Sequence, residues 1–227
     1  MFSRIPPITK ALLLVNIAMF LLQRAIDGPL LDGPMRDWLA LWPILPDAEV
    51  LSGNSLFMPW QLVSYAFLHG EPMHLIFNML ALVMFGAQLE HLWGSRRYLI
   101  YFGVCVLGAG VCQLALASAS VSQGGPIYPT IGASGGVFGL LLGYGMLFPN
   151  QRVMLLFPPI PMKARTLVIV YGVLELLLGF TGLQPGVAHF AHLGGMLFGW
   201  LLIRFWRRSP KPPSSSGQGP RQLRVVK

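Results

Sequence analysis

Ser134 is the residue whose surroundings most suggest chemistry, because it is a single hydroxyl set among glycines. It lies between Gly132 and Gly135 in the stretch GASGGVFG, at the start of an apolar segment that contains no charged residue. A serine hydroxyl is a weak nucleophile unless an adjacent base accepts its proton. A reactive Ser134 therefore requires a base that another segment brings to the same depth.

His192 is the candidate for that base, and glycines explain how it could reach the serine. In AHFAHLGGMLFGW, one helical face carries His192, Gly195 and Gly199, which are spaced at i, i+3 and i+7. A second stripe, at i, i+4 and i+8, follows the serine: Gly135, Gly139 and Gly143. Two such faces can pack closely, which would bring Ser134 and His192 within hydrogen-bond reach. Taken alone, the glycines are also consistent with ordinary helix packing, and Ser134 with a helix cap.

His74 and Asn78 supply a third part of a hydrolytic site. In FLHGEPMHLIFNM they lie at i and i+4, on one face of a helix near its outer end. Both side chains can donate hydrogen bonds. Acyl transfer from a serine needs donors aimed at the developing oxyanion, including the serine's own N–H at a helix N-terminus. For this pair alone, a polar contact between helices is the alternative.

The composition places these residues in a membrane. Only 11% of the 227 residues are charged, 54% are hydrophobic and the mean hydropathy is +0.62, which leaves too little polar surface for a soluble globule. Six apolar stretches are long enough to span a bilayer with their flanks, or where the bilayer is thinned. They are Ala11–Leu22, Pro72–Leu89, Tyr98–Ala117, Ser134–Phe148, Leu167–Phe180 and Val187–Trp206. The predicted fold is an all-α polytopic membrane protein with six transmembrane helices.

Lys and Arg residues cluster in alternate loops, which predicts the orientation. They precede the first stretch, separate the second from the third and the fourth from the fifth, and follow the sixth. By the positive-inside rule both termini are cytoplasmic. We expect a cytoplasmic N-terminus at residues 1–10, a membrane domain at 11–206 and a basic, disordered tail at 207–227. The net charge of +8 then reflects topology and contact with anionic membrane lipids, with no nucleic-acid partner.

The fourth apolar segment, Ser134–Phe148, is too short to cross a full bilayer. Its fifteen residues span about 22 Å of a hydrocarbon core of about 30 Å. Ser134 should therefore be recessed below the outer surface, where irregular backbone is tolerated only in protein or around a water-filled cavity. We expect a wet cavity around Ser134. The long link Asp27–Met58 is expected in the outer leaflet, with Trp38 and Trp42 at the membrane interface.

Together and in this order, HGEPMHLIFNM, GASGGVFG and AHLGGMLFG resemble the motifs of the rhomboid family of intramembrane serine proteases. The resemblance covers residues 11–206 and implies a rhomboid-like bundle of six helices. It implies a Ser–His dyad without a carboxylate, with Ser134 as nucleophile and His192 as general base and then acid. His74 and Asn78 would line the oxyanion hole with the serine N–H. It further implies single-pass transmembrane proteins as substrates, cut in or near the outer part of the membrane segment, and no metal or cofactor.

Two positions depart from the family pattern. Many relatives carry a tyrosine four residues after the nucleophile, stacked under the catalytic histidine, where this chain has Phe138. The aromatic ring is kept, so we expect activity to survive. Many relatives also carry a Trp-Arg pair in the first loop, where Arg36-Asp37-Trp38 comes nearest without matching it. The conformation of that loop does not follow from the resemblance.

The remaining histidines have weaker claims to a role in the reaction. His69 matches a histidine often found in the family's second helix, and we interpret it as structural. His189 lies one turn before His192 and is the histidine most easily confused with the base. His91 follows Glu90, and both are expected in a solvated charge cluster.

Glu175 lies inside the fifth apolar stretch, where an acid is costly and suggests a function by default. The family motifs do not explain it. Our hypothesis is that Glu175 meets polar groups on the second helix, and so helps to close a lateral gate of the kind that relatives are thought to use.

Two rival functions remain open. A transporter or channel could relay protons or bind a metal through the histidines and acids in or near the membrane, although His-Glu-x-x-His and an inverted repeat are absent. A catalytically inactive rhomboid-like protein could bind membrane clients, although inactive relatives usually lack the serine, the histidine or both. Because no targeting presequence precedes the first stretch, we expect a bacterial inner membrane.

Overall fold

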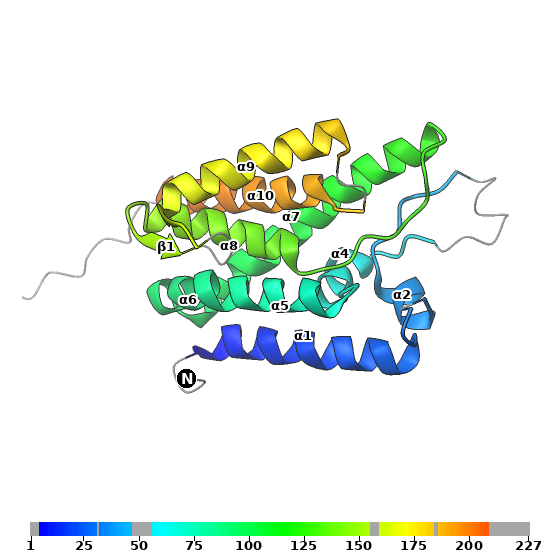
Figure 1. Ribbon diagram of the computed structural model, residues 1–227, viewed down its shortest axis with the longest axis horizontal. Coiled ribbons are helices and arrows are strands. Elements are labelled where there is room, and N and C mark those ends of the chain that lie inside the picture. Colours follow the sequence, from blue (N-terminus) through cyan, green and yellow to red (C-terminus); the bar gives the residue numbers. More distant parts are fainter. Residues whose placement is uncertain (1–4, 31, 47–55, 155–158, 184–185, 209–227) are drawn as a thin grey trace, which may run out of the picture.

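In the computed structural model the long helices lie side by side along one axis (Figure 1). The structure describes residues 5–30, 32–46, 56–154, 159–183 and 186–208. The elements are, in chain order, α1 (Pro7–Ile26), α2 (Pro34–Leu39), α4 (Gln61–Ser64), η2 (Tyr65–Phe67), α5 (Pro72–Ala81), η3 (Leu82–Gly86), α6 (Ala87–Trp93), α7 (Ser95–Ser122), α8 (Ser134–Leu147), β1 (Arg152–Met154), β2 (Pro161–Lys163), α9 (Ala164–Thr181) and α10 (His189–Arg208). The π-helical turn η3 joins α5 and α6 into one helix. The two short strands pair antiparallel.

Among the described residues, four helices are long and apolar enough to cross a membrane: α1, the joined helix Pro72–Trp93, α7 and α9. α8 is apolar but has only 14 residues, or about 21 Å. α10 has 20 residues but is made more polar by His189, His192, Arg204, Arg207 and Arg208. A mostly helical membrane bundle is therefore confirmed, whereas the count of six spanning helices stays a prediction. The helix α10 includes the first two residues of the predicted tail, and 209–227 lie outside the described residues.

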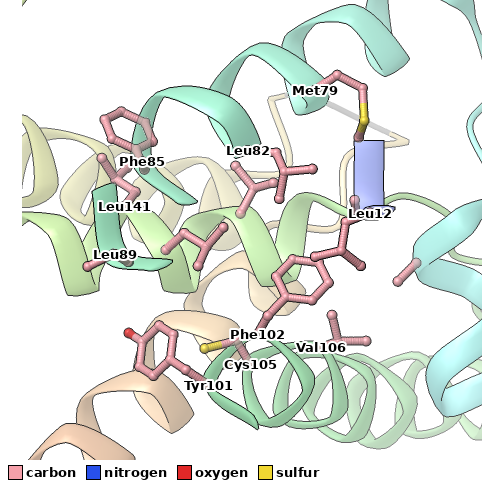
Figure 2. Close-up of a cluster of buried hydrophobic side chains, with 14 of the residues drawn as sticks. Leu12, Met79, Leu82, Phe85, Leu89, Tyr101, Phe102, Cys105, Val106 and Leu141 are labelled. Atoms are coloured by element: carbon pink, nitrogen blue, oxygen red, sulfur yellow. The ribbon is translucent and has the colours of Figure 1, made fainter. Parts of the chain in front are cut away.

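The core lies between the joined helix, α7 and α8. Figure 2 shows its buried side chains, which include Leu82, Phe85, Leu89, Tyr101, Phe102, Cys105 and Leu141. In addition, the Tyr101 hydroxyl donates a hydrogen bond of 2.8 Å to the carbonyl of Gly139. Because lipid is as apolar as these side chains, close packing and such hydrogen bonds stabilise the helix contacts.

The cationic segments gather at one end of the bundle. The start of α1, the end of α6, the β1–β2 hairpin and the end of α10 all lie at the left in Figure 1. The guanidinium carbon of Arg97 lies 4.2 Å from the ring centroid of Trp206, which joins α7 to α10 there. This arrangement agrees with the alternate-loop pattern of Lys and Arg, while the side of the membrane on which this end lies stays a prediction.

The first loop folds against the segment that leads into α8. Asp27 caps α2, because its two carboxylate oxygens accept bonds of 2.8 and 3.0 Å from the N–H groups of Met35 and Arg36. Further along, Leu41 pairs with Thr130 through two backbone hydrogen bonds. The loop therefore helps to hold the chain that positions Ser134.

The two tryptophans of this loop differ in their surroundings. Trp38 is 63% exposed and stacks on Trp60, as expected for a residue at the interface. Trp42 is only 7% exposed, and its backbone N–H donates to the side-chain oxygen of Gln61. The interface prediction is therefore wrong for Trp42, because the pairing of this segment with Thr130 draws it into the protein. Residues 47–55 of the loop lie outside the described residues.

Glu90 caps α1 from the neighbouring helix. Its carboxylate accepts bonds of 2.6 to 2.9 Å from the N–H of Ile8, the N–H and hydroxyl of Thr9 and the hydroxyl of Ser95. It is 2% exposed, so the expectation of a solvated charge cluster is wrong for Glu90, whereas His91 is exposed. A carboxylate here satisfies N–H groups that have no partner within α1 and complements the helix dipole.

We expect Glu90→Ala to lower the apparent Tm by about 5–10 °C, because several charge-assisted hydrogen bonds are lost and the N–H groups of α1 are left unsatisfied. Thermal melting in detergent, followed by circular dichroism, measures this change. His91→Ala alters the adjacent exposed residue and serves as the matched control. Equal shifts in the two variants would contradict the capping role.

Candidate active site

Ser134 is the first residue of α8, whose N-terminal end lies inside the length of the bundle (Figure 1). The chain turns just before it at Gly132, which has a φ of +122° and donates its N–H to the carbonyl of Tyr65. A Cβ at Gly132 would be strained and would lie 2.8 Å from Nε2 of His74. Glycine therefore suits this position, and the turn leaves the serine at a helix N-terminus.

His192 lies in the first turn of α10, and its Nε2 is 2.8 Å from Oγ of Ser134. The ring of Phe138 stacks on the imidazole, with centroids 4.2 Å apart and planes 4° from parallel. Because Phe138 is one turn after Ser134, the helix that carries the serine also supports the histidine. The ring thus lies where the family resemblance implies.

Glycines allow α8 and α10 to approach closely enough for this contact. A Cβ on Gly195 would collide with the carbonyl oxygen of Gly135, and a Cβ on Gly139 would lie 3.1 Å from the carbonyl oxygen of Gly195. The last glycine of each stripe lies next to α7 instead. A Cβ on Gly143 or on Gly199 would meet the hydroxyl of Tyr101. The expected glycine faces therefore meet at the ends of the stripes that lie next to the serine and the histidine.

Among the described residues, the polar contacts of Glu175 are to α10, and none is to the helix that carries His74. Its Oε2 lies 2.8 Å from Nδ1 of His192 and 2.7 Å from Nδ1 of His189, and the residue is 8% exposed. The hypothesis that Glu175 meets polar groups on the second helix is therefore wrong, because α9 packs along α8 and α10. Among the described residues, the ring of His189 makes its polar contact with Glu175. The histidine that contacts Ser134 is His192.

His74 and Ser134 lie beside the same glycine. A Cβ built on Gly132 would be 2.8 Å from Nε2 of His74 and 3.8 Å from Oγ of Ser134. Asn78 is buried one turn further along α5, and its amide donates a bond of 3.0 Å to the carbonyl of His74. An amide nitrogen carries two hydrogens, so one remains for a further acceptor. Asn78, one of the expected oxyanion donors, thus uses one amide hydrogen within its own helix and keeps the other for an oxyanion.

His69 lies behind His74. The two rings are edge to face with centroids 5.0 Å apart, and His69 is fully buried. Neither of its ring nitrogens has a partner among the described residues. These contacts agree with a structural role in supporting the ring of His74.

Glu175, His189 and His192 could also hold a metal ion, because their ligand atoms lie within 4.8 Å of one another. The fit with the neighbouring serine is poor. A metal on Nδ1 of a neutral His192 would leave the ring proton on Nε2, which would then donate to Ser134 and could not accept its proton. A metal at this cluster is therefore incompatible with His192 acting as the base.

Two residues of the site that lie on α9 were not correctly predicted from the sequence. Glu175 was singled out but was assigned partners on the wrong helix, and Tyr171 was not singled out. The ring of Tyr171 lies edge to face against Phe138, with centroids 6.0 Å apart. The spacing of Tyr171, Glu175 and Gly179 at i, i+4 and i+8 in an otherwise apolar helix was the available signal.

Comparison with known proteins finds relatives that cover most of the chain. The family model described as Rhomboid domain matches residues 57–209. The chain is 32% identical over 184 residues to RHOMBOID-like protein 4 of Arabidopsis thaliana, which covers 81% of this chain and 42% of that protein. It is 28% identical to Rhomboid protease GlpG of Yersinia enterocolitica over 206 residues, and to that of Klebsiella pneumoniae over 194 residues. These alignments cover 90% and 85% of this chain and 64% and 60% of the relatives, so the chain spans less than two thirds of each.

Proposed function

The chain belongs to the rhomboid family, and we propose that it is an intramembrane serine endopeptidase that uses Ser134 and His192. Rhomboid family members are intramembrane serine proteases, and the apolar helices identify this chain as an integral membrane protein. The observation that carries the proposal is the distance of 2.8 Å from Nε2 of His192 to Oγ of Ser134. A hydroxyl in contact with an imidazole is the arrangement needed for an activated nucleophile.

In the proposed reaction, Oγ of Ser134 attacks the carbonyl carbon of the scissile peptide while Nε2 of His192 accepts the hydroxyl proton. The carbonyl bond opens to a tetrahedral oxyanion. When this intermediate collapses, the C–N bond breaks, the leaving amine takes the proton from His192, and an acyl-serine remains. Water then attacks the ester and gives a proton to Nε2. The second collapse returns that proton to Ser134 and releases the carboxylic acid.

The oxyanion is held by the backbone N–H of Ser134 and the side chains of His74 and Asn78. The serine N–H begins α8 and has no partner within the helix, so it is free to donate toward the developing charge. The position of His74 beside Gly132 supports its role, because both the ring and the serine flank that glycine. Asn78 contributes its second amide hydrogen.

Substrates in this proposal are single-pass transmembrane proteins, cut in or near the outer part of the membrane segment. The short α8 supports this proposal: its 14 residues are fewer than a full span needs, so its first residue, Ser134, would lie within the depth of a substrate's membrane segment. Water enters from the outer side through a polar cavity. The protein lies in a bacterial inner membrane with the cationic end of the bundle and both termini in the cytoplasm, in contact with anionic lipids.

The test is reconstitution of the purified protein in vesicles with a panel of tagged single-pass membrane proteins. Mass spectrometry of new termini should identify a cut in the outer part of a transmembrane segment, present with the intact protein and absent with Ser134→Ala. Binding of clients without any cut, by protein shown to be folded, would instead indicate an inactive membrane binder. Proton or metal flux into empty vesicles would indicate a transporter.

Asn78→Ala is expected to lower kcat by about 10²–10³ with little change in KM, because an oxyanion donor acts on the transition state. The cleavage assay measures both constants. Asn16→Ala is the matched control, since the Asn16 amide likewise donates to its own helix four residues back, at 2.8 Å, but lies in α1. Equal kcat in Asn78→Ala and the parent would remove Asn78 from the oxyanion hole.

A further inference from the structure

We propose that Glu175 is a positioning residue for His192, so that the site works as a Ser134–His192–Glu175 array with His189 holding the carboxylate. The inference rests on the proposed function and changes one part of it. The family resemblance implies a dyad with no carboxylate, whereas here a buried glutamate contacts the histidine on the side away from its contact with the serine.

The contact between Glu175 and His192 selects the tautomer of the imidazole. An ionised carboxylate can only accept hydrogen bonds, so Nδ1 of His192, at 2.8 Å from Oε2, must carry the hydrogen. In a neutral ring, Nε2 then carries the lone pair, and this atom is 2.8 Å from Oγ of Ser134. Glu175 therefore holds the ring in the one form that can accept the serine proton.

His189 fixes the carboxylate in turn. Its Nδ1 lies 2.7 Å from the same Oε2, and its Nε2 has no partner among the described residues. The polar contact of this buried ring is thus directed at Glu175. Two N–H donors on one oxygen satisfy an acid that would be costly if it were unpartnered inside a membrane helix. The residue that resembles a second base is therefore a support for the first.

One face of α9 is shaped for this arrangement. Tyr171, Glu175 and Gly179 lie at i, i+4 and i+8 on that face. A Cβ on Gly179 would be 3.2 Å from Cβ of His189, so the absence of a side chain lets α9 come close to the start of α10. Tyr171 supports Phe138, whose ring stacks on His192. The imidazole is held on its face by Phe138 and at its edge by Glu175.

The carboxylate also acts during the reaction. When Ser134 gives its proton to Nε2, the imidazole of His192 becomes positively charged. An ionised Glu175 at 2.8 Å stabilises that charge, while the Nδ1 proton stays on the ring. The pair is buried, where charges interact more strongly than in water. The largest loss on removing the carboxylate should therefore appear in kcat.

Glu175→Gln is expected to lower kcat by about 10²–10⁴ while KM stays within about twofold, because the amide can present an N–H to His192 and favour the wrong tautomer. Glu175→Asp keeps the negative charge, so its kcat should be at least about tenfold higher than that of Glu175→Gln. Asp32→Asn makes the corresponding change from acid to amide at an exposed residue of the first loop and should retain the parent constants. All four proteins are assayed in vesicles, with their melting temperatures measured in parallel.

A kcat for Glu175→Gln equal to that of the parent would overturn the positioning role. So would loss of activity in the parent on metal chelation, with recovery on adding Zn²⁺, since the three side chains would then be metal ligands. NMR of protein labelled with ¹⁵N-histidine separates this inference from the proposed function. A downfield Nδ1–H resonance of His192 that Glu175→Gln removes supports the array, and its absence in the parent overturns it. If the parent shows this resonance but cleaves no substrate, the proposed function is overturned and the contact between Glu175 and His192 stands.

Discussion

Alanine at Ser134 or at His192 is expected to lower kcat/KM by about 10⁵–10⁶. The serine supplies the nucleophile and the histidine the base, so either change removes the same chemical step. The double variant should then be no slower than either single variant, because residues that act as a unit have non-additive effects. The initial rate of product formation, with a substrate obtained from the vesicle panel, measures this loss.

The control is His91→Ala, which changes an exposed histidine at the opposite end of the joined helix from His74. It should keep the parent rate, and all variants should melt within about 5 °C of the parent. A high residual rate in Ser134→Ala would contradict that serine as the nucleophile. Activity retained in His192→Ala but lost in His189→Ala would move the base to His189.

A single methyl group at Gly195 is expected to abolish cleavage and to lower the apparent Tm by more than about 10 °C. The added Cβ would collide with the carbonyl oxygen of Gly135, and both groups belong to helix backbone that cannot move aside alone. α8 and α10 must therefore separate, which pulls His192 away from Ser134. Melting in detergent and cleavage in vesicles measure the two effects.

Gly103→Ala provides the comparison for this variant. Gly103 is also a glycine in a long helix, α7, but a Cβ there would meet nothing within 4 Å. Alanine at this position should keep full activity and an equal or higher Tm, because alanine favours helix more than glycine does. If Gly195→Ala matched Gly103→Ala in both measurements, close approach of α8 and α10 would not be required for the site.

The features that could be predicted from the sequence are local ones. Hydropathy located the long helices, and the spacing of glycines after Ser134 and His192 indicated two faces that can pack closely. Family membership was predicted from three short motifs and is confirmed by the family model over residues 57–209. Each of these signals lies within one segment, so no knowledge of the helix arrangement was needed to read them.

The features that could not be predicted depend on which segments are neighbours. The cost of burying Glu175 was visible, but its partners follow from the packing of α9 on α10. Glu90 likewise looked like a surface acid, because the start of α1 that it caps is about 80 residues away. Trp42 looked like an interface residue until the pairing of Leu41 with Thr130 turned its segment inward.

Labelling of the purified protein with a fluorophosphonate probe, followed by peptide mass spectrometry, tests the central claim most directly. It asks whether Ser134 is activated by His192, and it needs no substrate. We predict a single adduct on Ser134 in the intact protein and none in His192→Ala. An intact, folded protein that stays unlabelled, or an adduct on another serine, would contradict the Ser134–His192 site.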